Sequence, residues 1–63
     1  MGETGERDRL IRMQEVTERT GLSKRMIYRL IEQGRFPLQY KPGGWSSRWS
    51  EQEVEAWMEQ QRS

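Results

Sequence analysis

A chain of 63 residues with 32% apolar content is long enough for one compact domain and too short for a second. It contains no cysteine and no histidine, which excludes a disulfide and removes the usual soft metal ligands, thiol nucleophile and general base. We therefore expect no enzyme activity, no cofactor and no metal site. Because neither a secretory signal nor an apolar run of membrane-spanning length occurs, we expect a cytoplasmic protein without membrane association.

The formal net charge of +1 conceals a strongly uneven distribution of charge along the chain. Segment 24–48 carries six basic residues and one acid, a balance of +5. Segment 1–23 has five acids against four bases, and segment 49–63 has four glutamates against one arginine. Only the central segment therefore carries the positive field that a polyanionic partner would recognise.

The chain is predicted to begin with a disordered tail followed by a short helix. Residues 1–9 are rich in Gly, Glu and Arg and lack hydrophobic periodicity, so burial cannot offset the entropy lost on ordering them. Met13 and Val16 then recur at helical spacing before Gly21, a residue typical of helix C-termini. This pattern predicts a first helix over 13–20.

A second helix is predicted over 23–33. Ser23 is a good N-cap, and Gly34 follows the last turn as a helix-ending residue. Four apolar side chains share one face of this helix: Met26, Ile27, Leu30 and Ile31. Only residues 21–23 separate the two helices, and a short turn containing glycine is typical of a helix-turn-helix unit.

A two-stranded hairpin is predicted over 36–49. Pro37 opposes helix formation, and apolar and polar side chains alternate from Phe36 to Tyr40 as they do in strands. The Pro-Gly-Gly run at 42–44 is a turn signal. We therefore expect two strands that pair across this turn and project from the helices as a wing.

A third helix is predicted from about 51 to 60. Ser50 and Glu53 have the spacing of a capping box, and three apolar side chains follow at helical spacing: Val54, Trp57 and Met58. Because its glutamates would repel phosphate, we assign this helix to the core, with residues 61–63 frayed and the domain covering 10–60. The predicted fold class is mainly α with a small β-hairpin, in the order helix, helix, two-stranded wing, helix: a winged helix-turn-helix.

The second helix is the candidate recognition helix for duplex DNA. Because successive residues turn by about 100°, the face opposite the apolar stripe carries Lys24, Arg25, Tyr28, Arg29 and Glu32. Arg25 and Arg29 lie one turn apart, and an arginine fork matches the O6 and N7 acceptors of guanine in a major groove. Ser23 and the first free amides add donors for a phosphate. The candidates on this helix are Ser23, Lys24, Arg25, Tyr28 and Arg29. The alternative is that these cations form only a solvated helix face.

The predicted wing supplies a second group of DNA-contact candidates. Two adjacent glycines let the backbone approach another surface closely, and cations, hydroxyls and a tryptophan surround them. The wing and flank candidates are Arg35, Lys41, Gly43, Gly44, Trp45, Ser46, Ser47 and Arg48. Trp45 either contacts DNA or packs on the hairpin, and packing is slightly favoured. Trp49 and Trp57 are expected in the core.

Several motifs occur in an order that resembles a known family. They are Arg12-Met13-Gln14-Glu15-Val16, Thr20-Gly21-Leu22-Ser23, Ile27-Tyr28-Arg29-Leu30-Ile31, Gly34-Arg35-Phe36-Pro37, Arg48-Trp49 and Glu53-Val54-Glu55-Ala56-Trp57. The set is similar to the AlpA-type prophage regulators over about 10–59. Two positions depart from the family pattern, because Trp45 stands where a basic wing residue is frequent and Ser47 where an apolar strand residue is usual.

The resemblance implies a fold related to phage excisionases and to the DNA-binding part of MerR-type regulators. The implied partner is double-stranded DNA. By matching position, the wing is supplied by Lys41 and residues 43–48, and the recognition helix by Ser23, Lys24, Arg25, Tyr28 and Arg29. The protein would act at the nucleoid of a prokaryote as a transcriptional regulator or as an excisionase that bends an attachment site, and the motifs leave that choice open. Integrase, or further copies of the protein on adjacent DNA sites, are the other implied partners.

Two further expectations concern assembly and an alternative function. No heptad pattern extends beyond the third helix, so we expect a monomer in free solution. The alternative is a small protein-interaction module in which exposed Tyr40, Trp45 and Met58 bind a phage or host protein and the basic face is incidental. The two functions differ in salt dependence, because phosphate contacts weaken steeply as salt rises and apolar docking does not.

Overall fold

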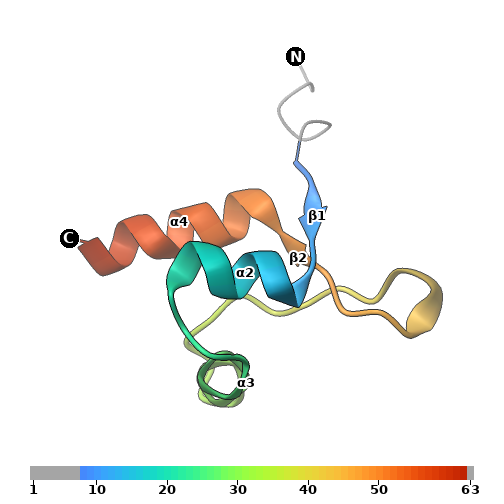
Figure 1. Cartoon of the computed structure of the whole chain (residues 1–63), viewed down its shortest axis with the longest axis horizontal. Coiled ribbons are helices and arrows are strands. Elements are labelled where there is room, and N and C mark those ends of the chain that lie inside the picture. The colour runs from blue at the N-terminus through green and yellow to red at the C-terminus, as the bar shows by residue number, and fades with distance from the viewer. Residues whose placement is uncertain (1–7, 63) are drawn as a thin grey trace.

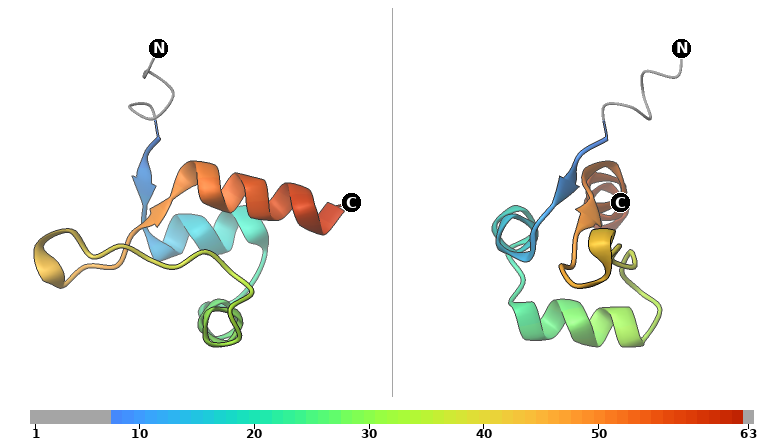
Figure 2. Two further views of the ribbon diagram at one scale, coloured as in Figure 1. Left: turned by 180° about the vertical axis from the view of Figure 1, so that it is seen from behind. Right: turned by 90° about the vertical axis from the view of Figure 1, so that its right-hand side faces the viewer.

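The computed structural model describes residues 8–62, which form a small, mainly helical globule with a two-stranded antiparallel sheet (Figure 1). The elements in chain order are β1 (Leu10–Ile11), α2 (Met13–Thr20), α3 (Lys24–Glu32), a single 3₁₀ turn (Pro42–Gly44), β2 (Trp49–Ser50) and α4 (Glu51–Arg62). In Figures 1 and 2, α2 and α4 lie on one side of α3, while the 41–48 loop projects sideways from the body of the molecule.

The first two helices begin and end at the residues that carry local signals. Gly21 ends α2 in the left-handed conformation with φ of 76°, and its N–H donates to the carbonyl of Thr17 at 2.9 Å. The Ser23 hydroxyl caps α3 by accepting from the N–H of Met26 at 3.1 Å. Gly34, with φ of 71°, follows the end of α3. The predicted helices and their short connection are therefore confirmed.

The two-stranded sheet differs from the predicted hairpin. β2 pairs antiparallel with β1 near the N-terminus, and Ile11 lies opposite Trp49. Within the part of the chain that the structure describes, the expected wing holds one isolated bridge between Tyr40 and Arg48. The order strand, helix, helix, strand, helix therefore replaces the predicted order, and the prediction of two strands in the wing is wrong. Burial explains the difference. Pairing β1 with β2 places Ile11 and Trp49 together in the core, whereas strands in the 41–48 loop would bury no comparable apolar side chains.

The core lies where the two strands meet the three helices. Its buried apolar side chains are Ile11, Val16, Ile27, Phe36, Trp49 and Val54. Trp57 is half-buried, with its ring centroid 4.9 Å from that of Phe36 at an interplanar angle of 63°, and its Nε1–H donates to the Arg35 carbonyl at 2.7 Å. Met26 was expected on the buried stripe but is 40% exposed. It lies about 100° around the helix from Ile27, so the buried stripe of α3 is narrower than predicted.

The N-terminus of α4 is held by a polar cluster that includes a residue of the predicted tail. Ser50, only 2% exposed, accepts from the N–H of Glu53 at 3.2 Å and donates its hydroxyl to Asp8 Oδ2 at 2.5 Å. Asp8 Oδ1 accepts from the N–H of Gln52 at 3.0 Å. The Ser50 half of the capping box is therefore present, while the Glu53 carboxylate turns to the Tyr40 hydroxyl. Of the predicted tail, residues 1–7 lie outside the described residues.

Asp8 makes the stability of the fold depend on acid pH. Its pKa lies below the ordinary value of 3.8 because the carboxylate accepts the Ser50 hydroxyl and the Gln52 N–H. A carboxylate whose pKa is lowered by folding stabilises the protein above its unfolded-state pKa, and the contribution is lost as the pH falls through the folded-state pKa. We expect Asp8→Asn to lower the urea midpoint at about pH 7 but to match the unsubstituted protein near about pH 2. Urea unfolding at both pH values checks this, and a difference that persists in acid would assign the effect to packing.

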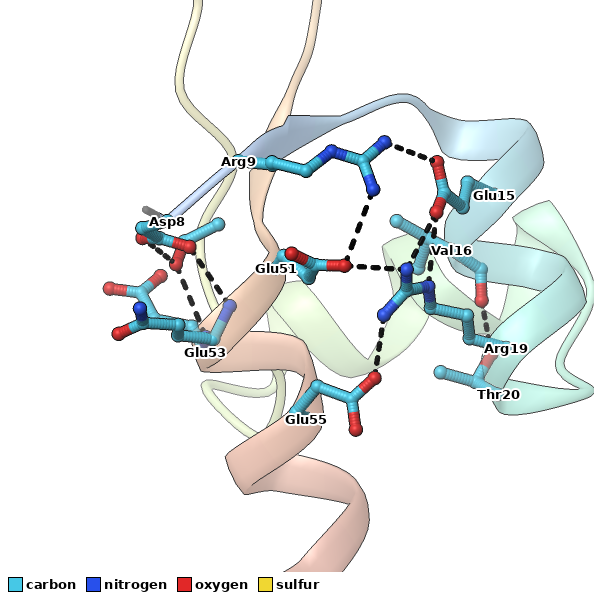
Figure 3. Close-up of polar contacts among 11 residues, drawn as sticks. Asp8, Arg9, Glu15, Val16, Arg19, Thr20, Glu51, Glu53 and Glu55 are labelled. Carbon is cyan, nitrogen blue, oxygen red and sulfur yellow. Dashed lines mark hydrogen bonds and ion pairs between the residues drawn. The ribbon is translucent and has the colours of Figure 1, made fainter. Parts of the chain in front are cut away.

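An ion network joins α2 to α4 (Figure 3). The Arg19 guanidinium contacts Glu15 at 2.7 Å and the α4 residues Glu51 and Glu55 at 2.6 Å each. These contacts, first the hydrogen bonds to Glu15 and Glu51, raise the pKa of Arg19 above its already high ordinary value. Arg9 adds longer contacts of 3.5 Å to Glu15 and Glu51. Glu15, Glu51 and Glu55 are thus engaged in ion pairs within the molecule, with Arg9 and Arg19 as their partners.

Candidate nucleic-acid interface

The cations of α3 point into solvent and pair with no carboxylate of the described residues. Lys24, Arg25 and Arg29 are all exposed. Within residues 8–62, the ion pairs use Arg9, Arg19 and Arg62 and none of these three. The positive charge of α3 is therefore free to act on a ligand, which the sequence pattern alone could not establish.

The N-terminus of α3 adds backbone donors to this charge. The first intrahelical bond runs from the N–H of Ile27 to the carbonyl of Ser23 at 3.0 Å, so the amides of Lys24 and Arg25 precede the hydrogen-bonded ladder. Ser23 is exposed, and its hydroxyl oxygen already accepts the N–H of Met26. The Ser23 hydroxyl hydrogen and the N–H groups of Lys24 and Arg25 are donors of the kind that bind phosphate at helix N-termini.

Tyr28 lies on the flank of α3 instead of its exposed centre. The side chain is half-buried, and its ring centroid lies 6.4 Å from that of Trp49 with an interplanar angle of 57°. This aromatic contact turns one side of the ring toward the core. Of the five recognition-helix candidates, Ser23, Lys24, Arg25 and Arg29 are thus exposed and Tyr28 is half-buried.

The 41–48 loop exposes the predicted wing residues to different degrees. Exposed residues of the loop are Lys41, Gly43, Gly44 and Trp45, while Ser46, Ser47 and Arg48 are half-buried. Gly43 and Gly44 both adopt positive φ, 75° and 89°, a conformation that side chains disfavour. The guanidinium of Arg48 donates to the carbonyl of Ser47 at 3.1 Å and makes no ion pair in the described chain.

Trp45 lies at the surface, outside the core. It is 84% exposed, and its Nε1 edge lies beside Gly43 of the turn, so the structure shows a contact with the loop but no burial. The core is filled by other aromatic side chains, since Trp49 is fully buried and Trp57 packs against the core cluster. Trp45 is therefore available for a contact outside the chain.

The base of the loop is anchored to the domain. Tyr40 and Arg48 exchange two backbone hydrogen bonds of 2.6 and 2.7 Å. The Tyr40 hydroxyl donates to Glu53 of α4 at 2.8 Å, and this bond with the adjacent negative charge raises the pKa of Tyr40 above its ordinary value of 10.0. Arg35 is exposed at its side chain and makes no carboxylate contact among the described residues, while its carbonyl accepts from Trp57.

Comparison with known proteins identifies the family. Residues 9–62 match the model of the family described as prophage CP4-57 regulatory protein (AlpA). The chain belongs to this family. It is also 45% identical over 51 residues to a protein of Enterobacteria phage P4 named "Uncharacterized protein ORF88". That alignment covers 81% of the chain but 58% of the phage protein, so the chain spans less than two thirds of this relative. No solved structure matches the chain.

The AlpA-family assignment confirms the resemblance seen in the motifs, and the structure adds residues that sequence analysis missed. Arg12 is exposed at the start of α2 and has no carboxylate partner within the described chain, so it joins the unpaired cations. Sequence analysis did not select Arg12 because segment 1–23 has a negative net charge. Asp8 was missed because it was assigned to the tail, although an aspartate close to a helix N-terminus is a recognised capping signal.

Metal binding and membrane spanning each require a specific arrangement of residues. Within residues 8–62, no group of three or more acidic residues is arranged to hold a metal ion. Among the same residues, no helix has the length and apolar character needed to cross a membrane. The exposed cations of α3 and the 41–48 loop, which contact no carboxylate within residues 8–62, are the candidate site for a polyanion.

Proposed function

We propose that this protein binds duplex DNA as a winged helix-turn-helix module. The observation that carries the proposal is the division of its cations into two groups. Arg9, Arg19 and Arg62 pair with glutamates, whereas the cations of segment 24–48 face solvent or a backbone carbonyl and contact no carboxylate within the described chain. Unpaired cations on one helix and one loop suit a polyanion that spans both.

In this proposal α3 enters the major groove. Arg25 and Arg29, one turn apart and both exposed, read guanine edges, while Lys24 and the amides at the helix N-terminus bind phosphates. Tyr28 reaches the DNA sugar-phosphate backbone from the flank of α3. Ile27 of α3 is fully buried and anchors the recognition helix to the core. The short connection from α2 restricts where this helix can lie.

The 41–48 loop takes the place of a two-stranded wing in this mechanism. Its single bridge at Tyr40 and Arg48 is enough to direct the tip away from the body of the molecule (Figure 2). Lys41 and Arg48 contact the DNA phosphates beside the major groove that α3 occupies. The glycine turn allows the loop to approach the adjacent DNA backbone or minor groove closely.

The biological role we propose is that of a transcriptional regulator or excisionase of an integrated phage-like element. Membership of a prophage regulatory family supports this role. A single module of this size buries roughly 600–1,000 Å² on DNA, which gives limited specificity on its own. We therefore propose that further copies on adjacent sites, or an integrase, complete the complex, and that the free protein is a monomer.

A second candidate function is docking of a phage or host protein. An open groove of about 750 Å³ lies between segment 34–40 and α4, and its apolar lining includes Phe36, Leu38 and Trp57. Leu38 is 67% exposed and Tyr40 43%, so an apolar peptide would find partners there. This groove lies outside α3 and the 41–48 loop, so an experiment that locates binding separates the two functions.

Titration of isotope-labelled protein with a generic duplex at low salt tests the proposal. Non-specific affinity of roughly 10⁻⁴ to 10⁻⁶ M is detectable without knowledge of the target sequence. We expect amide shifts over 23–29 and 41–48 that fade steeply as salt rises, because counterion release drives phosphate binding. Absence of shifts, or shifts confined to the groove between segment 34–40 and α4, would reject DNA binding in favour of protein docking.

A further inference from the structure

Trp45 is the most exposed of the large apolar side chains in the described chain, at 84%. The fold does not need it, because Trp49 is fully buried and Trp57 packs on Phe36. A solvent-exposed indole loses the stabilisation that burial of its large apolar surface would give. Its position at the tip of the 41–48 loop therefore calls for a ligand.

The loop holds this indole on a braced support. The 3₁₀ turn is closed by the N–H of Gly44, which donates to the carbonyl of Lys41 at 2.8 Å. A Cβ placed on Gly43 would lie 3.4 Å from Trp45 Nε1, so the ring lies over the bare glycine backbone. Below the tip, the paired Tyr40 and Arg48 and the hydrogen bond from Tyr40 to α4 tie the loop to the core. The backbone that carries the ring is thus tied to the body of the molecule, which reduces the cost of ordering the loop on binding.

The charge around the ring indicates an anionic occupant. Lys41 precedes the turn, is exposed and contacts no carboxylate within residues 8–62, and Arg48 follows it with only a backbone acceptor. An exposed apolar ring flanked in the sequence by two cations without carboxylate partners in the described chain suits the minor groove of a duplex. Proteins that kink DNA insert an apolar side chain between base steps while nearby cations bind the phosphates.

We propose that Trp45 wedges its indole between adjacent base pairs from the minor groove and kinks the duplex. This inference rests on the proposed DNA binding and adds deformation of the DNA to it. Pyrimidine–purine steps are the target class, because they unstack and kink at the lowest cost. The protein then selects deformable sites at positions where it makes no base-edge hydrogen bond.

Fluorescence of 2-aminopurine tests the wedge, because its emission rises when the base loses its stacking neighbours. Short duplexes carry 2-aminopurine in place of adenine at TA steps, and the full chain is added at low salt while binding is followed separately by anisotropy. We expect emission to rise with the unsubstituted protein, to remain high with Trp45→Phe, and to stay at the level of free DNA with Trp45→Ala. We expect Trp45→Ala to weaken binding by about tenfold and to leave the salt slope unchanged.

Leu38→Ala is the matched control, since it removes another exposed apolar side chain from outside the loop tip. It should behave as the unsubstituted protein in both readouts. If Trp45→Ala raises the emission as strongly as the unsubstituted protein, or if the latter binds without raising it, the wedge is overturned and DNA binding stands. If no salt-dependent binding occurs at all, the proposed function and the wedge are overturned together.

Discussion

Replacement of Trp49 by alanine is expected to unfold the protein. The Trp49 side chain is fully buried, its strand pairs with β1 through Ile11, and its ring neighbours Tyr28 of α3. Truncation of a buried tryptophan costs about 3–5 kcal/mol. A chain of this size has a free energy of unfolding of roughly 3–9 kcal/mol, so the loss removes much or all of it. Circular dichroism during thermal and urea unfolding measures the effect.

Two variants serve as controls for this prediction. Trp45→Ala removes the same side chain from an 84% exposed position, so we expect it to leave the urea midpoint nearly unchanged. Trp49→Phe keeps an aromatic ring in the core and removes Nε1, a buried donor with no acceptor among the described residues, so it should cost less than alanine. A stable Trp49→Ala variant, or equal losses for the alanine variants at 45 and 49, would contradict the core described above.

Arg29→Ala is expected to weaken specific DNA binding by about 1–3 kcal/mol while leaving the fold intact. Arg29 lies on the exposed side of α3 with no carboxylate partner in the described chain, so no internal interaction is lost. If it reads a guanine, its removal also relaxes base preference at one position of the site. Binding to a duplex selected for tight association, and to variants of that duplex at each position, measures both effects.

Arg62→Ala is the matched control for Arg29→Ala. It removes the same charge from the end of α4, where Arg62 forms an exposed contact with Glu59 at 3.8 Å. We expect a change in affinity no larger than long-range electrostatics gives, and no change in base preference. An unfolded Arg29→Ala variant would refute the exposed position of Arg29, and equal losses for Arg29→Ala and Arg62→Ala would refute a direct contact.

The three helices could be predicted from the sequence because their signals act over only a few residues. Ser23 and Ser50 cap the helices that follow them, and Gly21 and Gly34 adopt the left-handed conformation that ends a helix. Helical periodicity likewise placed Arg25 and Arg29 opposite the buried stripe. Membership of the AlpA family was visible for the same reason, since its motifs coincide with these caps and turns.

Helix positions, charge distribution and family were thus determined by the sequence itself, through short-range steric and hydrogen-bonding preferences. The tertiary structure alone decided that β2 pairs with β1, that Trp49 is buried while Trp45 is exposed, and which arginines find glutamate partners. These outcomes depend on residues far apart in the chain. Strand partners are chosen by the apolar surface that their pairing buries, and ion pairs by which helices come to lie together.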